Sequence, residues 1–359
     1  MSFLFKKIVL FSMSLFVFFL FFSIIELSLP IDFFNFRVWE SLVVRSLPRV
    51  SIGPFYPNKN VKKQEVGEFG AHSVFALKKN VEWQTDSFGY RFSGVITSTF
   101  DIVVIGDSNI TGSALSQSEM FSSVLGNLIH RTVYPLAPAN INNFIQDKRF
   151  VDHQPTMIIL SAIERTIFDL PAIVEQGGKK YKIKIFLEKV IKHPKLSPIM
   201  FLLDRITKFS IINRVRSLFA PLYGQSLGEP INGNLYLRDW TSLNSMNESL
   251  YAQSLSILES YNKYFKQRNI KFIFLPIPNK ETIYYKDFGK ERPLFLSRLI
   301  ADLSDRDVAV VNTVFAFQKV YDEKNTPLYF SDDSHWNANG VNLVASLVKE
   351  QLDKMIQKE

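Results

Sequence analysis

The sequence predicts an α/β protein in which a largely parallel sheet is flanked by helices and an apolar helix precedes the folded body. From about residue 75, the 359-residue chain alternates short apolar runs with longer amphipathic segments. This alternation favours strands that are joined by helical crossovers. Apolar residues make up 47% of the chain, which leaves enough for a sizeable core when the N-terminal run is set aside.

The first element is an apolar run over residues 8–25 that contains no charge. An uninterrupted run of about 18 or more apolar residues can span a bilayer as a helix. Lys6 and Lys7 precede the run, and positive charge there places the N-terminus in the cytoplasm. No Ala-x-Ala pattern follows, which favours a retained anchor over a cleaved signal peptide. We therefore expect residues 1–30 to anchor the chain and the main domain to lie outside the cytoplasm.

The rest of the chain is predicted to divide into two parts. Residues 31–75 carry three prolines and no clean periodicity, which is typical of a juxtamembrane connector. Residues 76–359 are expected to form the main domain. A Ser116–Glu119 capping box predicts the start of its first long helix. The expected strands are 101–106, 132–136, 156–161, 271–277 and 308–313, and the expected helices are 116–130, 246–268 and 337–355.

A basic segment at about 170–240 interrupts this alternation. Eleven lysines and arginines lie between Lys179 and Arg216, against two acidic residues. We predict a helical insertion that caps one end of the sheet, with an ordinary surface subdomain as the alternative. Outside the cytoplasm, a membrane surface or an anionic polymer is a more natural partner for it than nucleic acid.

A serine lies directly after a predicted strand, in Gly106-Asp107-Ser108. In open α/β sheets, ligands bind beyond the carboxyl ends of the strands. The turn would present the Ser108 hydroxyl together with backbone N–H groups that can hold a developing oxyanion. A plain turn, in which Asp107 only braces the backbone, is the alternative.

A histidine with two preceding acids lies near the C-terminus, in Asp332-Asp333-Ser334-His335. A carboxylate on one ring nitrogen fixes the tautomer and leaves the other nitrogen free as a base. The alternative is a helix N-cap cluster in which His335 is incidental. Together with Ser108, these residues supply a nucleophile, a base and an orienting acid, the parts of acyl-transfer chemistry.

The two motifs together resemble the SGNH (GDSL-like) esterase and acyltransferase superfamily, which implies a three-layer, flavodoxin-like fold. Asp333-Ser334-His335-Trp336 resembles the Asp-x-His-Trp motif of the alginate-type polysaccharide O-acetyltransferases. Asp332 stands where the wider superfamily has its acid. The resemblance covers roughly residues 80–168 and 245–355. Further stretches that look like this branch are 85–91, 163–165 and 276–284.

The resemblance implies roles for individual residues. Ser108 would be the nucleophile and His335 the base. Asp333 is the preferred orienting acid, with Asp332 as its rival. The backbone N–H groups of Ser108 and Ala137 would hold the oxyanion. The asparagine of the superfamily's third block is missing, because the matching strand ends in Ser161-Ala162-Ile163. Further candidates are Asn109 and Asn140 as oxyanion donors, and Arg165 and Lys280 as substrate contacts or structural pairs.

The resemblance also implies a function and partners. We expect a serine acyltransferase in a bacterial inner membrane, with its main domain in the periplasm, that O-acetylates a cell-surface polysaccharide. A multi-pass membrane acyltransferase would supply the acyl donor. A deacylating esterase and a non-catalytic glycan-binding or assembly subunit are the alternatives. We expect no metal or nucleotide cofactor, because the chain has no cysteine, no histidine pair at ligand spacing and no glycine-rich phosphate loop.

Overall fold

The computed structural model describes residues 3–35, 37–45, 52–70, 74–96, 99–174, 195–219, 228–237, 247–324 and 326–357. The chain forms two compact units: residues 1–57 with 179–225, and residues 58–178 with 226–359. The second unit contains the sheet and the candidate site. Residues 58–75, which were predicted to be connector, belong to this unit and include a strand.

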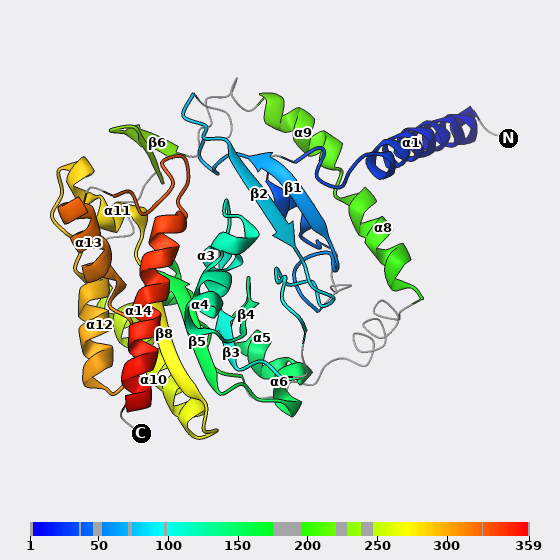
Figure 1. Ribbon diagram of the computed structural model, residues 1–359. Coiled ribbons are helices and arrows are strands. Elements are labelled where there is room, and N and C mark those ends of the chain that lie inside the picture. Colours follow the sequence, from blue (N-terminus) through cyan, green and yellow to red (C-terminus); the bar gives the residue numbers. More distant parts are fainter. Residues whose placement is uncertain are drawn as a thin grey trace. The chain divides into compact units, whose positions relative to one another are not determined.

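The central sheet has four parallel strands: β3 (Ile102–Ile105), β4 (Val133–Leu136), β5 (Met157–Ile163) and β8 (Lys271–Ile277). Their order is β4-β3-β5-β8, so the chain winds outward in both directions from β3 (Figure 1). This order is that of a flavodoxin-like doubly wound sheet, and it confirms the predicted fold class. In such sheets the ligand site lies at the carboxyl ends of the strands where the winding reverses, here β3 and β5.

Helices cover both faces of the sheet, so its strands are apolar on both sides. Val103 and Ile105 of β3 pack into one core cluster, and Ile102 and Val104 pack into the other. The first cluster is covered by α5 (Ile141–Gln146), α6 (Lys148–Asp152), α10 (Glu248–Lys266) and α12 (Phe295–Asp305), and the second by α4 (Phe121–Ile129), α13 (Thr313–Lys324) and α14 (Ala338–Gln357).

Two sequence-based expectations for secondary structure were wrong. The predicted strand at 308–313 is a single bridge, in which Val310 pairs with Phe274. The chain then turns into α13 at Thr313, whose N–H donates to the Val311 carbonyl, so a longer strand cannot form. Within the predicted helical insertion, β6 (Gly228–Ile231) and β7 (Asn234–Leu237) form an antiparallel hairpin. Its Asn232-Gly233 turn has positive φ at both residues, the turn that this dipeptide favours.

The remaining elements of the sheet-bearing unit are short. The antiparallel pair β1 (Asn60–Glu65) and β2 (Lys79–Gln84) forms a separate two-stranded sheet. Four more helical turns follow strands or precede longer helices. They are α3 (Ser108–Thr111), η1 (Gln117–Glu119), η2 (Glu164–Asp169) and α11 (Lys280–Ile283), with η5 (Tyr285–Phe288) after the last of them.

The other unit is built on α1 (Phe3–Ser28), which is long and apolar enough to cross a membrane. It also contains α2 (Val38–Leu42), α8 (Ser197–Thr207) and α9 (Ser210–Phe219). Both α8 and α9 pack against α1. Residues 175–194, 220–227 and 238–240 of the predicted basic segment lie outside the described residues.

Candidate active site

Ser108 is the first residue of α3, three residues beyond the end of β3. Asp107 caps this short helix, because its Oδ1 accepts the Asn109 N–H at 2.8 Å. Its Oδ2 also accepts the N–H of Ile163 on β5 at 3.3 Å. A Cβ on Gly106 would lie 2.5 Å from Ile110, so only glycine fits there. Asp107 therefore braces the turn and the adjacent strand end, which fixes the position of Ser108.

His335 connects Ser108 to Asp333. The His335 Nε2 lies 2.7 Å from the Ser108 Oγ, and the His335 Nδ1 lies 2.6 Å from Asp333 Oδ1. Asp333 is completely buried, and its Oδ2 accepts the Glu68 N–H at 2.9 Å. A carboxylate on Nδ1 favours the tautomer that carries a proton there, which leaves Nε2 able to accept the serine proton. The three residues thus form a continuous chain of hydrogen bonds.

Asp333 and His335 each stabilise the charged form of the other. Burial by itself lowers the pKa of His335, but the Asp333 carboxylate outweighs it, and the pKa lies above the ordinary 6.5. Burial likewise raises the pKa of Asp333, but the imidazole outweighs it, and the pKa falls below the ordinary 3.8. Asp333 is therefore ionised at neutral pH and stabilises the imidazolium that would form when His335 takes a proton.

This electrostatic coupling predicts the pH dependence of ester turnover. The base must be neutral to accept the Ser108 proton, so kcat/KM should fall as the pH falls through the pKa of His335. Because that pKa is raised, the fall should begin at a higher pH than it would with an unperturbed imidazole. Initial rates over a pH series would measure this limb. A midpoint below 6.5, the ordinary histidine value, would contradict the coupling.

Asp332, the rival acid, faces away from the histidine. Its Oδ2 accepts the Gly67 and Leu77 N–H groups at 2.8 and 2.9 Å, and its Oδ1 lies 2.7 Å from the Lys79 Nζ. Its carbonyl oxygen accepts two further N–H groups from residues 69 and 70. The structure thus places Asp333 against His335 and uses Asp332 to tie the segment between β1 and β2 to the histidine loop.

Lys280 holds the same loop from the other side. Its side chain is fully buried, and the pKa of the amine is lowered to about 8 by that burial. Of the two alternatives for Lys280, the structure favours a structural role over a substrate contact, because its donors are already engaged. The Nζ donates to the carbonyl oxygens of Leu235, Phe330, Ser331 and Asp333 at 2.7–3.3 Å.

Replacing Lys280 with methionine is expected to weaken both the fold and the site. Four carbonyl groups would lose a donor, two of them in buried contacts, and a buried group left unsatisfied costs about 1–3 kcal/mol. Because one of these carbonyls belongs to Asp333, kcat should also fall, while KM should change less. Urea unfolding and steady-state kinetics would measure both effects. Lys286→Met is the control, because the Lys286 side chain is 57% exposed and should be nearly neutral. Wild-type unfolding and kcat in Lys280→Met would contradict this role.

The other predicted site residues differ in where they lie and in what they contact. Ala137 is buried in the loop after β4, and this loop lies beside the serine turn, since the Ala139 N–H donates to the Gly106 carbonyl. Asn109 is buried next to Ser108, with its amide directed to Asp107. Asn140 instead caps α5, where its side-chain oxygen accepts two backbone N–H groups. Arg165 makes a long contact of 3.4 Å with Asn279.

Two residues that support the site were not among the predicted site residues. The buried Arg91 donates to the Thr111 and Gly112 carbonyls, which fixes the end of α3. Glu164 is buried beside the end of β8, accepts from Asn279 and Thr282, and has its pKa raised to about 7 by burial. Arg91 and Glu164 both lie in stretches that carry the family resemblance, and this resemblance is the sequence signal that could have identified them.

A metal ion would compete with the histidine–aspartate contact. Glu68, Asp333 and His335 each offer a ligand atom, and these atoms lie within 4.8 Å of one another. However, Asp333 and the His335 Nδ1 already bind each other at 2.6 Å. A cation at this cluster would have to displace the hydrogen bond that orients the imidazole, so the geometry suits acid–base chemistry better than metal binding.

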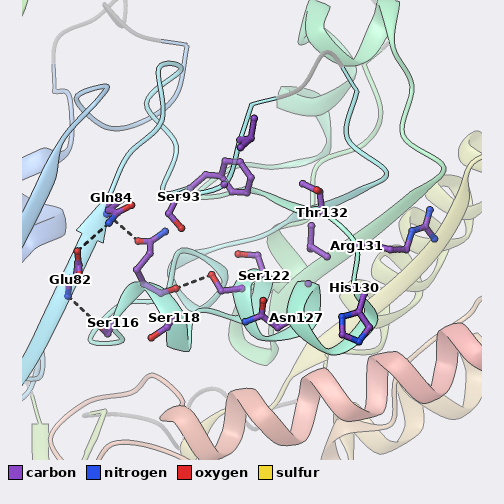
Figure 2. A pocket seen from close by; sticks show the side chains of 17 residues that line it. Glu82, Gln84, Ser93, Ser116, Ser118, Ser122, Asn127, His130, Arg131 and Thr132 are labelled. Carbon is purple, nitrogen blue, oxygen red and sulfur yellow. Dashed lines mark hydrogen bonds between the residues drawn. The ribbon is translucent and has the colours of Figure 1, made fainter.

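A separate hollow lies along α4 and β2 (Figure 2). Its lining includes many hydroxyl and amide side chains, and it extends from Glu82 and Gln84 at one end to His130 and Arg131 at the other. Ser108, Asp333 and His335 are not among the residues that line it. The hollow is therefore distinct from the place where the nucleophile lies.

Residues 231–359 match the family model of the SGNH hydrolase-like domain of the acetyltransferase AlgX. The match confirms the predicted resemblance to the SGNH superfamily and to its alginate-type branch. It contains Asp333 and His335, whereas Ser108 lies before it. No curated protein matches the chain.

Solved structures resemble this chain at low identity. A protein described as lipolytic and of the G-D-S-L family, from Desulfitobacterium hafniense, is 11% identical over 71% of this chain and 99% of its own, with a TM-score of 0.36. A GDSL-like lipase from Bacteroides thetaiotaomicron is 12% identical over 74% and 93%, with a TM-score of 0.33. An acetyl xylan esterase from Butyrivibrio proteoclasticus is 10% identical over 79% and 68%, with a TM-score of 0.32. At these values, their substrates do not carry over to this chain.

Proposed function

We propose that this protein is a serine acyltransferase that O-acetylates a cell-surface polysaccharide outside the cytoplasm. The observation that carries the proposal is the chain of hydrogen bonds from Asp333 through His335 to the Ser108 hydroxyl. Ser108 and His335 lie 227 positions apart in the sequence, and their contact supports acyl transfer, which needs a base beside the nucleophile. The match to an acetyltransferase family model supports the choice of an acetyl group.

In the first half-reaction, the Ser108 Oγ attacks the carbonyl carbon of the acetyl donor while the His335 Nε2 accepts its proton. The Ser108 and Ala137 N–H groups stabilise the negative oxygen of the tetrahedral intermediate. The intermediate collapses, the bond to the leaving group breaks, and His335 returns the proton to that group. Ser108 is left as an acetyl ester.

In the second half-reaction, a hydroxyl of the acceptor sugar attacks the acetyl-serine. His335 takes the hydroxyl proton and later returns it to the Ser108 Oγ, so the enzyme is regenerated and an O-acetyl sugar is released. Asp333 stabilises the imidazolium in both halves. Water in place of the sugar would turn the same machinery into an esterase, so the acceptor decides between the two activities.

The proposed location and partners follow from α1. A helix of this length and apolarity near the N-terminus supports a single-pass anchor in a bacterial inner membrane, with the sheet-bearing unit in the periplasm. A periplasmic enzyme has no direct access to cytoplasmic acyl donors. We therefore propose that a multi-pass membrane acyltransferase delivers the acetyl group to this protein.

The proposal is tested by following where an acetyl group goes. The full chain in detergent would be given an activated acetyl ester, with and without an oligosaccharide acceptor, beside a Ser108→Ala control. We expect O-acetylated oligosaccharide with the wild type. Free acetate alone, unaffected by the acceptor, would instead support the esterase. Neither product from a folded chain would contradict acyl transfer and favour a glycan-binding or assembly subunit.

A further inference from the structure

The helices α8 and α9 carry an outward-facing apolar surface. In α8, Ile199, Leu202 and Leu203 lie one turn apart on one stripe, and they are 53%, 48% and 48% exposed. In α9 the stripe continues with Ile212 and Val215, and Phe209 lies between the helices. A surface helix of a water-soluble protein normally turns such residues toward the core. We call these six side chains the apolar stripe.

Two charged residues, Asp204 in α8 and Lys208 at its C-terminal cap, face inward instead. Asp204 and Lys208 lie on the side opposite the apolar stripe and are only 2% and 6% exposed. The Asp204 carboxylate accepts the Tyr56 hydroxyl and the Arg45 N–H, and the Lys208 Nζ donates to the Ser41 carbonyl. Within its own unit, α8 thus turns two charged groups and the Phe201 ring, which lies 5.4 Å from the Tyr56 ring, to the inner side, while the apolar stripe faces out.

The apolar stripe is continuous with the surface of α1. Both helices pack against α1, and the Phe209 ring lies 6.3 Å from the Phe19 ring. The Arg205 guanidinium donates to the Glu26 and Leu29 carbonyls at the C-terminal end of α1. In Figure 1, α8 and α9 meet near this end of α1 and run off to either side of it. Most large side chains of α1 are themselves exposed.

We propose that α8 and α9 lie in the membrane interface, with the apolar stripe embedded among the acyl chains around the end of α1. Interfacial helices of this kind bury an apolar face at the boundary between headgroups and acyl chains. We assign the lipid bilayer as the partner that covers the apolar stripe. The stripe adjoins α1, and the exposed apolar surface of α1 itself requires contact with acyl chains. The same contact through Arg205 would hold the end of α1 at a fixed depth in the bilayer.

The absence of cysteine from the chain makes a direct test possible. A single cysteine would be placed at Leu202, at Ile212, or at the control position Phe315, which is 61% exposed on α13. Each full-length variant would be labelled with a nitrobenzoxadiazole probe and reconstituted into nanodiscs of phosphatidylethanolamine and phosphatidylglycerol. Unfolding midpoints equal to that of the unlabelled chain would show that the labels are tolerated.

Lipids that carry a doxyl quencher should remove most of the emission at positions 202 and 212 and little at 315, while aqueous iodide should do the reverse. Iodide quenching at 202 and 212 equal to that at 315 would overturn the proposal. Protection from both quenchers would also overturn it, because a protein surface would then cover the stripe. The inference rests on the proposed membrane anchoring by α1, but the readout needs no enzymatic activity, so its outcome is independent of the proposed acyl transfer.

Discussion

Replacing Ser108 with alanine is expected to abolish ester turnover and leave the fold intact. The Ser108 Oγ is the hydroxyl that His335 Nε2 reaches, at 2.7 Å, so its removal deletes the nucleophile. Loss of a triad member typically lowers kcat on the order of 10⁴-fold or more. His335→Ala should cause a similar loss, and combining the two changes should add little, because the residues act as one unit. Steady-state rates with an activated acetyl ester would measure this.

Ser113→Ala provides a matched control for the serine replacement. Ser113 is also buried and close in sequence, but its hydroxyl has no hydrogen-bond partner among the residues that the structure describes. Its removal should leave turnover near the wild-type value. If Ser108→Ala retained turnover while Ser113→Ala lost it, the nucleophile would have been assigned to the wrong side chain.

Replacing each of the two adjacent aspartates with asparagine is expected to have different effects, on kcat for Asp333 and on stability for Asp332. Asp333→Asn should keep most of the stability but lower kcat by about 10⁴-fold, because an amide favours the wrong imidazole tautomer. Asp332→Asn should instead lower the free energy of unfolding. Its carboxylate is completely buried and paired with Lys79, and breaking a buried ion pair costs about 3–5 kcal/mol.

The aspartate comparison needs both measurements on both variants. Urea unfolding would give the free energy of unfolding, and ester turnover at neutral pH would give kcat. The expected pattern is a stable, inactive Asp333→Asn and a destabilised Asp332→Asn that retains turnover while it is folded. The opposite pattern would make Asp332 the orienting acid and would contradict the geometry at His335.

Much of the fold was predictable because its signals are local. The apolar runs at 101–106, 156–161 and 271–277 became β3, β5 and β8, and the stripe at 337–355 became α14. The strand predicted at 308–313 did not form, because a run of valines does not determine how many of its residues pair with a neighbouring strand. The hairpin at 228–237 was missed, although its Asn232-Gly233 turn is a strong local signal, because the surrounding composition favoured helices.

The candidate site was predictable only where a motif marks it. Ser108 and His335 stand in motifs, and the structure brings them within hydrogen-bonding distance. The choice between Asp332 and Asp333 was not decidable from spacing, because both lie close to the histidine. The choice depends on the segment between β1 and β2. Its N–H groups donate to the Asp332 carboxylate, which is more than 250 residues away in sequence. The four carbonyls around Lys280 are also distant from it in the sequence, so no sequence pattern predicts these contacts.

The most direct test of the central claim is covalent labelling of the nucleophile. The folded full-length chain would be treated with a fluorophosphonate, whose phosphorus is attacked by an activated serine hydroxyl with release of fluoride, and its peptides would be analysed by mass spectrometry. We predict an adduct on Ser108 in the wild type, none in Ser108→Ala, and very slow formation in His335→Ala. A folded wild type that stays unlabelled, or that is labelled at another residue, would contradict the assignment of Ser108 as an activated nucleophile.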